Sequence, residues 1–386
     1  MNPAGTVRVF LYYIMNLSYW EYKTWLSNID YTIVGSGIVG LNCALALREK
    51  HPHAKILVLE KGILPQGAST KNAGFACFGS ISEILSDLNS HTEEEVIQLV
   101  GKRWEGIHLL RKTLGDDTID YQQHGGHELF LESKEGLYNN CLDNLDRANK
   151  LLRPIFKIDA FEPQGNRFQF KNIKEQYITN TLEAQIDTGK MMAALLQLNE
   201  RKSIQILNAI AVEEFQEIGD WVSVKTNAFE FKTRKLLIVT NGFAAQLVGE
   251  KVIPARAQVI VTKPIPKLRI KGTFHLDEGY YYFRNIDGRI LIGGGRNLDF
   301  EGEQTYEHGE TQLIQNQLKI MLGEIILPNT SFEIEHRWSG IMGVGQDKKP
   351  IVKQLSNNVF CGVRLGGMGV AIGSHIGREL AELSLV

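Results

Sequence analysis

The stretch YTIVGSGIVG, residues 31–40, decides how this chain begins to fold. Its first four residues are aromatic or β-branched, which favours a strand, and a glycine-rich turn follows them directly. Apolar residues then recur at helical spacing between Val39 and Leu47. The apolar run 56–59 is typical of a strand buried on both faces of a parallel sheet, and it ends at Glu60. The sequence therefore predicts a strand–helix–strand unit.

The spacing G-x-G-x-x-G indicates a dinucleotide site when it lies between a strand and a helix. Gly35 permits a tight turn, Gly37 lets a pyrophosphate approach the backbone, and Gly40 allows close helix packing. The helix N-terminus adds free N–H groups and a positive dipole. Glu60 would accept a hydrogen bond from a ribose 2′-hydroxyl and repel a 2′-phosphate, so the pattern disfavours an NADP-type ligand.

Two further glycine-rich loops favour FAD over NAD as the dinucleotide. Residues 67–74 (GASTKNAG) follow the second strand, and residues 366–369 (GGMG) precede a C-terminal helix pattern. NAD needs only the first glycine loop. A flavin also needs a loop to hold its ribityl chain and a helix dipole at its pyrimidine end. The three loops together therefore predict bound FAD.

The composition is that of a globular protein with more than one domain. The chain has 386 residues, 43% hydrophobic and 22% charged, with a formal net charge of −2. This balance offers no basic field for a nucleic acid. The four cysteines form no C-x-x-C pair, which argues against a disulfide scaffold and favours a reducing, cytoplasmic compartment. No run approaches the ~18 apolar residues of a membrane-spanning helix.

The remaining elements follow from hydrophobic periodicity, and residues 1–28 are expected to be an N-terminal extension. The apolar run Val9–Met15 is shorter than most signal-peptide cores and no cleavage site follows it; Met15 is an alternative start. Helices are predicted over residues 92–114, 137–152, 190–198, 300–322 and 370–385, the first with a capping box. Strands are predicted over residues 127–132, 204–207, 212–215, 222–225, 236–240, 281–283 and 290–292.

Four blocks carry a likeness to a known family: residues 35–40 with Glu60, 67–74, 281–296 (YYFRNIDGRILIGGGR) and 337–373. They resemble the D-amino-acid oxidase (DAO-type) superfamily of FAD-dependent oxidoreductases, which includes glycine oxidase and sarcosine oxidase. The likeness extends over about residues 29–386. The WSGIMG segment is most similar to the γ-glutamylputrescine oxidase-like branch.

The resemblance implies an α/β protein with a Rossmann-like FAD-binding domain and a mixed-sheet substrate domain, as in glycine oxidase. The FAD-binding domain is expected to comprise residues 29–90, 183–245 and 336–386, and the substrate domain residues 91–182 and 246–335. The residues expected to hold FAD are Gly35, Ser36, Gly37, Ile38, Val39, Gly40, Glu60, Lys61, Gly67, Ala68, Ser69, Thr70, Asn72, Ala73, Gly74, Val212, Asn241, Gly242, Gly340, Gly366, Gly367, Met368, Gly369 and Val370.

The substrate side departs from the family pattern. Members similar to glycine oxidase clamp the substrate carboxylate with an arginine, and the matching position here is Met342. A thioether cannot replace a bidentate charged bond, so the sequence predicts a preference for amines without a strongly held α-carboxylate. Arg364 is the alternative clamp. Tyr281 matches a tyrosine that holds substrate, and Arg284 is either a substrate contact or a paired structural charge.

Several side chains each have two interpretations. Lys71 neutralises flavin charge or is simply solvated. Cys77 lies near the flavin by resemblance, or fills apolar space. Cys361 lies outside the glycine loop, so we expect noncovalent FAD, unlike the covalent FAD of sarcosine oxidase-like members. His124 and His127 have no acidic or cysteine partner at ligand spacing, so we expect no metal site.

The resemblance implies oxidation of the C–N bond of an amine or amino acid by hydride transfer to flavin, followed by imine hydrolysis. Oxygen or a redox carrier would accept the electrons, and the sequence fixes neither the acceptor nor the oligomeric state. A non-catalytic FAD-binding protein is one alternative. A monooxygenase or NAD-linked dehydrogenase is another, but it needs a second nucleotide motif. The sole candidate, residues 293–296 (GGGR), lacks an acidic strand end after it.

Overall fold

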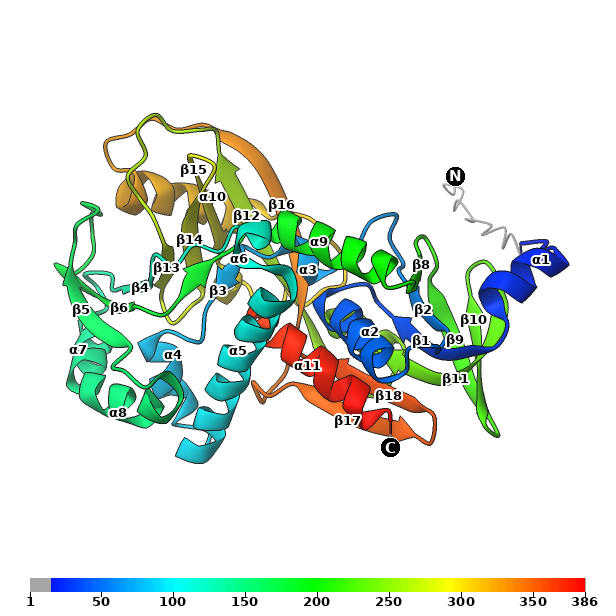
Figure 1. The fold of residues 1–386 in the computed structure, drawn as a ribbon. Coiled ribbons are helices and arrows are strands. Elements are labelled where there is room, and N and C mark those ends of the chain that lie inside the picture. Colours follow the sequence, from blue (N-terminus) through cyan, green and yellow to red (C-terminus); the bar gives the residue numbers. More distant parts are fainter. Residues whose placement is uncertain (1–14, 386) are drawn as a thin grey trace, which may run out of the picture.

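Two eight-stranded sheets form the body of the molecule (Figure 1). The computed structural model describes residues 15–385. The first sheet, on the right of Figure 1, has the order β17-β18-β11-β1-β2-β8, with β10 and β9 continuing from β11. The second has the order β16-β12-β15-β14-β13-β4-β6-β5. This is the α/β fold with a second mixed sheet that the sequence predicts.

The strands of the first sheet are β1 (Ile29–Val34), β2 (Ile56–Leu59), β8 (Gln205–Leu207), β9 (Val212–Ile218), β10 (Trp221–Thr226), β11 (Glu230–Ile238), β17 (Ile351–Ser356) and β18 (Val359–Val363). Those of the second are β4 (Gly126–Leu129), β5 (Phe161–Gly165), β6 (Gln176–Asn180), β12 (Ile253–Thr262), β13 (Thr273–Leu276), β14 (Tyr281–Ile286), β15 (Arg289–Gly294) and β16 (Ile334–Val344). A separate pair is formed by β3 (Phe75–Ala76) and β7 (Ala184–Gln185).

The α-helices are α1 (Tyr19–Glu21), α2 (Ile38–Lys50), α3 (Ala68–Lys71), α4 (Ile81–Asp87), α5 (Glu93–Leu114), α6 (Asp116–Ile119), α7 (Glu135–Asp143), α8 (Leu145–Phe156), α9 (Thr188–Arg201), α10 (Gln312–Met321) and α11 (Gly369–Leu383). Short 3₁₀ helices span Asn241–Gln246 and Arg296–Leu298, and π-helical turns span Tyr22–Leu26 and Leu322–Ile326.

The predicted strand–helix–strand unit forms β1, α2 and β2. β1 lies in the middle of the first sheet and pairs in parallel with β2 and β11. Alternate residues of β1 face two cores: Ile33 packs with the α2 and α11 side chains, and Val34 packs with Leu57 and the β10 side chains. The continuous apolar runs are explained by this burial on both faces.

Two helix predictions are wrong in extent. The pattern over 137–152 forms two helices, α7 and α8, with a break at Asn144. The helix expected from residue 300 begins only at Gln312, because the segment before it is held by tertiary contacts. There Glu303 is fully buried and accepts hydrogen bonds from Arg256 and Gln258. By contrast, α5 begins at Thr92 with the capping box that the sequence predicts.

Strand β16 departs from the expected division of the chain. That division placed residues 336–386 with the FAD-binding domain. In the structure, β16 pairs with β12 of the second sheet from Ile334 to Val344. The chain returns to the first sheet only at β17 and β18. The same stretch of sequence therefore contributes to both sheets.

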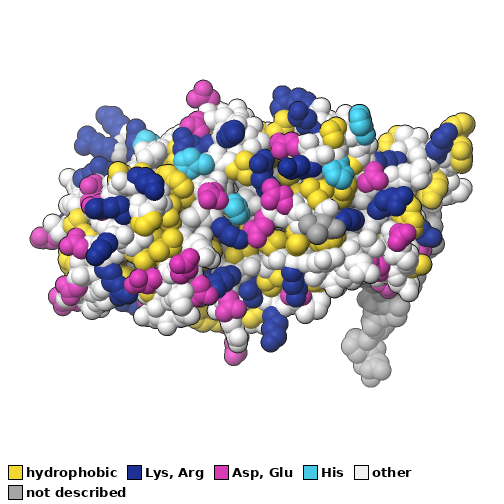
Figure 2. All heavy atoms as spheres, turned by 60° about the horizontal axis from the view of Figure 1, so that its bottom comes forward, with side chains coloured by type: hydrophobic (Ala, Val, Ile, Leu, Met, Phe, Trp, Pro, Cys, Tyr) yellow, Lys and Arg dark blue, Asp and Glu magenta, His cyan; other side chains and the backbone are white. Residues whose placement is uncertain are grey.

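The N-terminal part of the described chain lies at the edge of the first sheet. The start of the expected extension, including the apolar run before Met15, lies outside the described residues. Ser18 caps α1 through a capping box with Glu21. Within residues 15–385, every helix is too short or too polar to cross a membrane. On the face shown in Figure 2, basic and acidic side chains are interspersed.

A buried carboxyl group links α4 to the second sheet. Glu128 of β4 is 2% exposed, and its carboxylate accepts hydrogen bonds from the backbone N–H and the hydroxyl of Ser82. Burial outweighs these bonds and raises the pKa of Glu128 to about 7 from an ordinary value of 4.5. At pH values between 4.5 and about 7, the Glu128 carboxyl is therefore ionised in the unfolded chain and protonated in the folded protein.

We therefore expect Glu128 to make stability depend on pH. Below pH 4.5 the carboxyl is protonated in both states, and the free energy of unfolding falls as pH rises through about 7. Glu128→Gln removes this loss, so the wild type should lose ~2–3 kcal/mol relative to Glu128→Gln between about pH 4.5 and pH 8. Urea unfolding at both pH values measures it. Glu162→Gln, at an exposed position on β5, is the control; equal pH dependence in all three proteins would contradict the interpretation.

Candidate functional site

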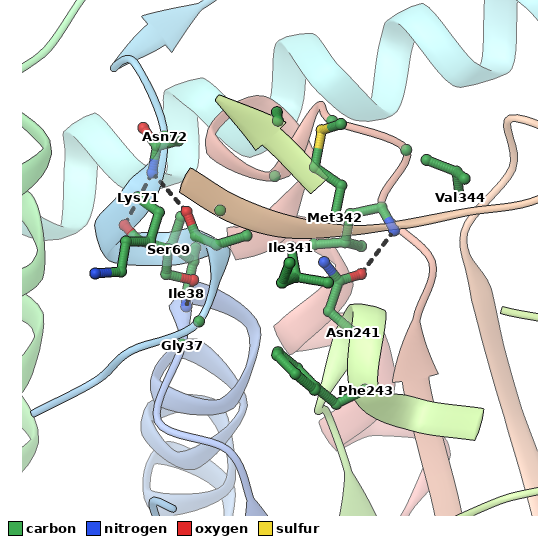
Figure 3. A pocket seen from close by; sticks show the side chains of 18 of the residues that line it. Gly37, Ile38, Ser69, Lys71, Asn72, Asn241, Phe243, Ile341, Met342 and Val344 are labelled. Atoms are coloured by element: carbon green, nitrogen blue, oxygen red, sulfur yellow. Dashed lines mark hydrogen bonds between the residues drawn. The ribbon is translucent and has the colours of Figure 1, made fainter. Parts of the chain in front are cut away.

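A cavity of about 710 Å³ lies between the two sheets, at the carboxyl ends of β1 and β2. Parallel sheets place ligands at this edge because the loops after neighbouring strands diverge there. Figure 3 shows the start of α2, the loop around Asn72, the turn at Asn241 and strand β16 surrounding it. The three glycine-rich loops of the sequence all contribute to its wall.

The first glycine loop is shaped by close backbone contacts. Gly35 has φ +115°, and a Cβ on Gly40 would come within 2.0 Å of the Gly35 carbonyl oxygen. A Cβ on Gly37 would come within 2.7 Å of Ser69 Oγ. Gly37 is the N-cap of α2 and has no side chain of its own, and the Ser69 hydroxyl accepts a hydrogen bond from the Ile38 N–H (3.0 Å), so the helix N-terminus and Ser69 meet at the cavity wall. At each of these three positions, a close contact or a positive φ explains why the residue is glycine.

Glu60 lies at the end of β2 in the cavity wall and is 7% exposed. Its Oε2 accepts hydrogen bonds from the Ser36 hydroxyl (2.8 Å) and the Ser36 backbone N–H (3.2 Å). Its Oε1 accepts one from the Gly62 N–H (2.9 Å). The carboxylate thus holds the glycine loop in shape and still faces the space where a ribose would bind.

The second loop is held by the start of α9 and by two strands of the second sheet. Asn72 Oδ1 accepts hydrogen bonds from the Gly74 N–H (2.8 Å) and the Thr188 hydroxyl (2.9 Å). Trp338 of β16 donates its indole N–H to the Lys71 carbonyl (2.9 Å). From β14, Arg284 donates to the carbonyls of Gly74 (3.0 Å) and Ile186 (2.6 Å). Arg284 is 3% exposed and does not line the cavity, so the structure places it as a structural clamp.

The third loop precedes α11. Gly366 and Gly367 have φ +59° and +84°, and the Gly366 N–H donates to the Gly343 carbonyl of β16 (3.0 Å). Asn241 Oδ1 accepts a hydrogen bond from the Leu365 N–H (3.1 Å), as Figure 3 shows. Because α11 begins here, its N-terminal dipole points at the cavity.

Most of the residues expected to hold FAD line one continuous cavity wall. Five do not reach it. Ser36, Gly40, Thr70, Gly74 and Gly242 lie behind the wall and support it. The residues in the wall are Gly35, Gly37, Ile38, Val39, Glu60, Lys61, Gly67, Ala68, Ser69, Asn72, Ala73, Val212, Asn241, Gly340, Gly366, Gly367, Met368, Gly369 and Val370.

The face of β14 that meets the cavity is the opposite of the one expected. Tyr281 packs in the core beneath α10 and is 6% exposed. Its neighbour Tyr282 lines the cavity, and its ring lies over Gly293, where a Cβ would come within 2.7 Å of it. The alternation of the strand is as predicted, but the sequence did not show which face is covered by a helix.

The two candidate carboxylate clamps have different positions. Met342 lines the cavity from β16, as expected for a wall residue. Arg364 does not line it: its Nε donates to the Lys349 carbonyl (3.0 Å), and Nη2 lies 3.9 Å from Asp347. The structure thus offers no support for Arg364 as a clamp.

The comparisons identify the family. A family model described as FAD dependent oxidoreductase (DAO) matches residues 30–383. The chain belongs to this family. The probable oxidoreductase OrdL of Haemophilus influenzae is 21% identical over 94% of this chain and 84% of its own length. The mitochondrial L-2-hydroxyglutarate dehydrogenase of Bos taurus is 20% identical over 81% of this chain and 71% of its own length.

A solved structure confirms the fold of this DAO-family chain. Glycine oxidase from Geobacillus kaustophilus superposes with a TM-score of 0.74 at 18% identity, covering 92% of this chain and 94% of its own. FAD is the cofactor, and the cavity fits it. The Gly67 position opens onto free space in the cavity wall, and two helix N-termini meet the wall. The likeness to the γ-glutamylputrescine oxidase-like branch stays a prediction.

The far end of the DAO cavity contains residues that the sequence did not single out. They lie on β3, α4, β13, β14, the turn between β13 and β14, and the 3₁₀ helix after β15: Phe75, Glu83, His275, Tyr280, Tyr282 and Arg296. The Phe75 ring meets those of His275 and Tyr282 edge-on, at 5.2 and 5.7 Å between centroids. Burial raises the pKa of Tyr282 to about 12, so its hydroxyl stays protonated.

A buried pair lies behind this end. Glu183 is 1% exposed, and its Oε1 accepts a hydrogen bond from the Phe78 N–H (2.8 Å). Its Oε2 lies 3.7 Å from His275 Nε2. Burial disfavours a charged imidazole, but the neighbouring Glu183 carboxylate outweighs it and raises the pKa of His275. His124 and His127 lie elsewhere, and residues 15–385 hold no metal-like cluster of three or more His, Cys, Asp or Glu side chains.

We expect FAD to bind noncovalently. Cys361 is fully buried in β18 and does not line the cavity. Cys77 does line it, but burial raises the pKa of its thiol well above the usual range, so the nucleophilic thiolate is scarce. Acid precipitation should therefore leave the flavin in the supernatant with the absorbance and mass of intact FAD. Flavin in the washed pellet would contradict this.

We also expect Glu60→Ala to weaken FAD binding. Removing the carboxylate takes away the ribose partner and the acceptor for Ser36 and Gly62, which should cost ~1–3 kcal/mol, or about 5–150-fold in Kd. Glu60→Gln keeps an acceptor oxygen and should lose less. Titration of the apoprotein with FAD, followed by fluorescence quenching, measures both. Equal affinity in wild type and Glu60→Ala would show that the carboxylate does not contribute.

Proposed function

We propose that this protein oxidises the C–N bond of an amine or amino acid, and that water then hydrolyses the imine product. Bound FAD supplies the two-electron acceptor for the hydride that leaves the α-carbon. The balanced result is a carbonyl compound, ammonia or an amine, and reduced cofactor, which oxygen or a redox carrier reoxidises. One observation carries the proposal: the FAD cradle and an aromatic chamber on the second sheet are parts of one cavity.

The chain's task in this reaction is orientation and exclusion of water. Tyr282, whose ring lies against Gly293, and Phe75, which meets that ring at a steep angle, give the chamber an aromatic wall. Met342 lines the same cavity from β16 with an apolar, adaptable side chain. Holding the substrate's C–H bond in one orientation converts binding energy into rate. No nucleophile is required.

A monooxygenase or an NAD-linked dehydrogenase receives less support, because each needs a second dinucleotide site. Residues 293–296 end the antiparallel strand β15 and lead into a three-residue 3₁₀ helix. A second dinucleotide site would instead need a strand followed by a full helix that opens toward the ligand. Oxidation of a C–O bond is the nearer alternative, because the bovine relative is a 2-hydroxy acid dehydrogenase by name.

The test is an anaerobic screen with matched substrate pairs. We expect flavin absorbance to bleach with at least one amine or amino acid, such as sarcosine, proline or glycine, and to persist with its hydroxy counterpart, such as glycolate or lactate. Admitting oxygen then shows whether oxygen reoxidises the flavin. Bleaching by the hydroxy acid alone would move the proposal to C–O oxidation. Bleaching by none of a broad amine set would contradict an amine-oxidising function.

A pair of variants on one strand locates the reaction. Tyr282→Phe alters the cavity wall, whereas Tyr281→Phe alters the core beneath α10. The rate of flavin reduction should change in Tyr282→Phe and stay close to wild type in Tyr281→Phe, with equal FAD content in both. A changed rate in Tyr281→Phe with an unchanged rate in Tyr282→Phe would instead support Tyr281 as the substrate contact, as the sequence suggested.

A further inference from the structure

The wall of the cavity contains an imidazole that is backed by a buried carboxylate. His275 lies on β13, is 5% exposed and lines the cavity. Its Nε2 has no hydrogen-bond partner within residues 15–385 and lies 3.7 Å from Glu183 Oε2. Glu183 itself does not line the cavity, so its carboxylate approaches the ring from behind the wall.

Glu183 is held in place by the backbone and by a glycine on the neighbouring strand. Its Oε1 accepts hydrogen bonds from the Phe78 N–H (2.8 Å) and the Gly79 N–H (3.3 Å), which leaves Oε2 for the imidazole. On β4, a Cβ at Gly126 would overlap with the Glu183 carboxylate. The carboxylate therefore occupies a prepared place, and its position beside His275 is fixed from two sides.

The other groups around the cavity are less suited to accept a proton at neutral pH. A lysine ammonium group, such as that of Lys71 or Lys348, has no lone pair to accept one. Burial raises the pKa of Tyr282 to about 12 and that of the Cys77 thiol well above its usual range, so both stay protonated. Carboxylates are weaker bases than an imidazole. His308, the other histidine among the lining residues, is exposed on the segment before α10.

We propose that His275, oriented by Glu183, accepts the proton that a substrate ammonium group must lose before its C–N bond is oxidised. An ammonium ion has no lone pair with which to form a C=N bond as hydride leaves the α-carbon. An N–H bond of the substrate therefore breaks first, and its proton converts the imidazole into an imidazolium. The neutral amine then loses hydride, and water converts the resulting iminium ion into a carbonyl compound and an ammonium ion. Water takes the proton from the imidazolium between turnovers.

The proposal rests on the proposed C–N oxidation and adds an acid–base pair to it. A carboxylate behind an imidazole fixes the orientation of the ring and stabilises the imidazolium that forms. Glu183 is therefore a positioning residue, whereas His275 contacts the substrate. Burying two ionisable groups is costly, and a wall that only excluded water would need neither of them.

The charges around His275 set the pH at which it can accept a proton. Burial lowers its pKa, but the carboxylates of Glu183, Glu83 and Glu128 outweigh burial and raise it above the ordinary 6.5. On β4, the His127 imidazole stays neutral because burial lowers its pKa to about 3. Below its own pKa, His275 already carries a proton and cannot accept another. Substrate oxidation should therefore slow as the pH falls through that pKa.

The test is the pH dependence of flavin reduction by an active amine, followed by anaerobic stopped-flow absorbance of the holoenzyme. At pH 7, His275→Gln should reduce the flavin about 100-fold more slowly than wild type, as expected for losing a general base. The deficit should shrink to a few-fold near pH 10, where an alkylammonium group loses its proton unaided. Glu183→Gln keeps the imidazole but removes a carboxylate that raises its pKa, so the acid limb should move to lower pH.

An NMR titration of the histidine side chains gives a second readout that needs no turnover. The imidazole signal that is missing from His275→Gln should titrate at lower pH in Glu183→Gln than in wild type. Two controls should reduce the flavin at the wild-type rate at pH 8. His336→Gln changes an exposed histidine on β16, and Glu128→Gln removes another buried group whose pKa is about 7.

The outcomes separate this inference from the proposed function. Equal pH profiles in wild type and His275→Gln, at equal FAD content, overturn the inference and leave C–N oxidation intact. Loss of the acid limb in Glu83→Gln, with His275→Gln unaffected, overturns it as well. If His275→Gln does not retain FAD, the Glu183→Gln profile decides, and an acid limb that has not moved contradicts the pair. If no amine reduces the flavin, the proposed function and the inference fail together.

Discussion

The cavity depends on one buried guanidinium that ties the second sheet to the loop 67–74. Arg284 lies on β14 of the second sheet and donates to the carbonyls of Gly74 and Ile186, which flank the two-stranded pair β3–β7. Burial lowers its pKa to about 10, so it stays charged at neutral pH. Its loss would take the Arg284 donor away from the Ile186 carbonyl, whereas the Gly74 carbonyl would still accept a hydrogen bond from the Ile186 N–H (2.8 Å). The loop 67–74, which closes the cavity, is thus positioned by a residue that never enters it.

The cofactor side could be predicted because its constraints are local. The contacts between Gly40 and Gly35, and between Gly37 and Ser69, are steric demands that only glycine meets, so they leave a readable spacing in the sequence. The strand–helix–strand unit is contiguous, and its apolar runs reflect burial on both faces. What the spacing did not reveal is that some members, such as Ser36, act by holding Glu60 rather than by lining the cavity.

The substrate side could not be predicted because its constraints are tertiary. Alternation along β14 separates Tyr281 from Tyr282, but only the packing of α10 against one face decides which tyrosine reaches the cavity. The helix expected from residue 300 is overridden by Glu303, which is drawn into the sheet by Arg256. Arg296 is visible in the sequence within GGGR, but the sequence does not show that its side chain lines the cavity and stacks on Phe300. Such placements are properties of the fold.

The electrostatic potential at the substrate end of the cavity depends on how the charge of each buried carboxyl group is compensated. Glu183 is offset by His275 and by the backbone N–H of Phe78, and Glu128 by its own proton up to about pH 7. Glu83 is partly compensated by the Ser80 N–H at the start of α4. Charges compensated in this way act weakly at a distance, whereas an uncompensated one dominates in a poorly screened cavity.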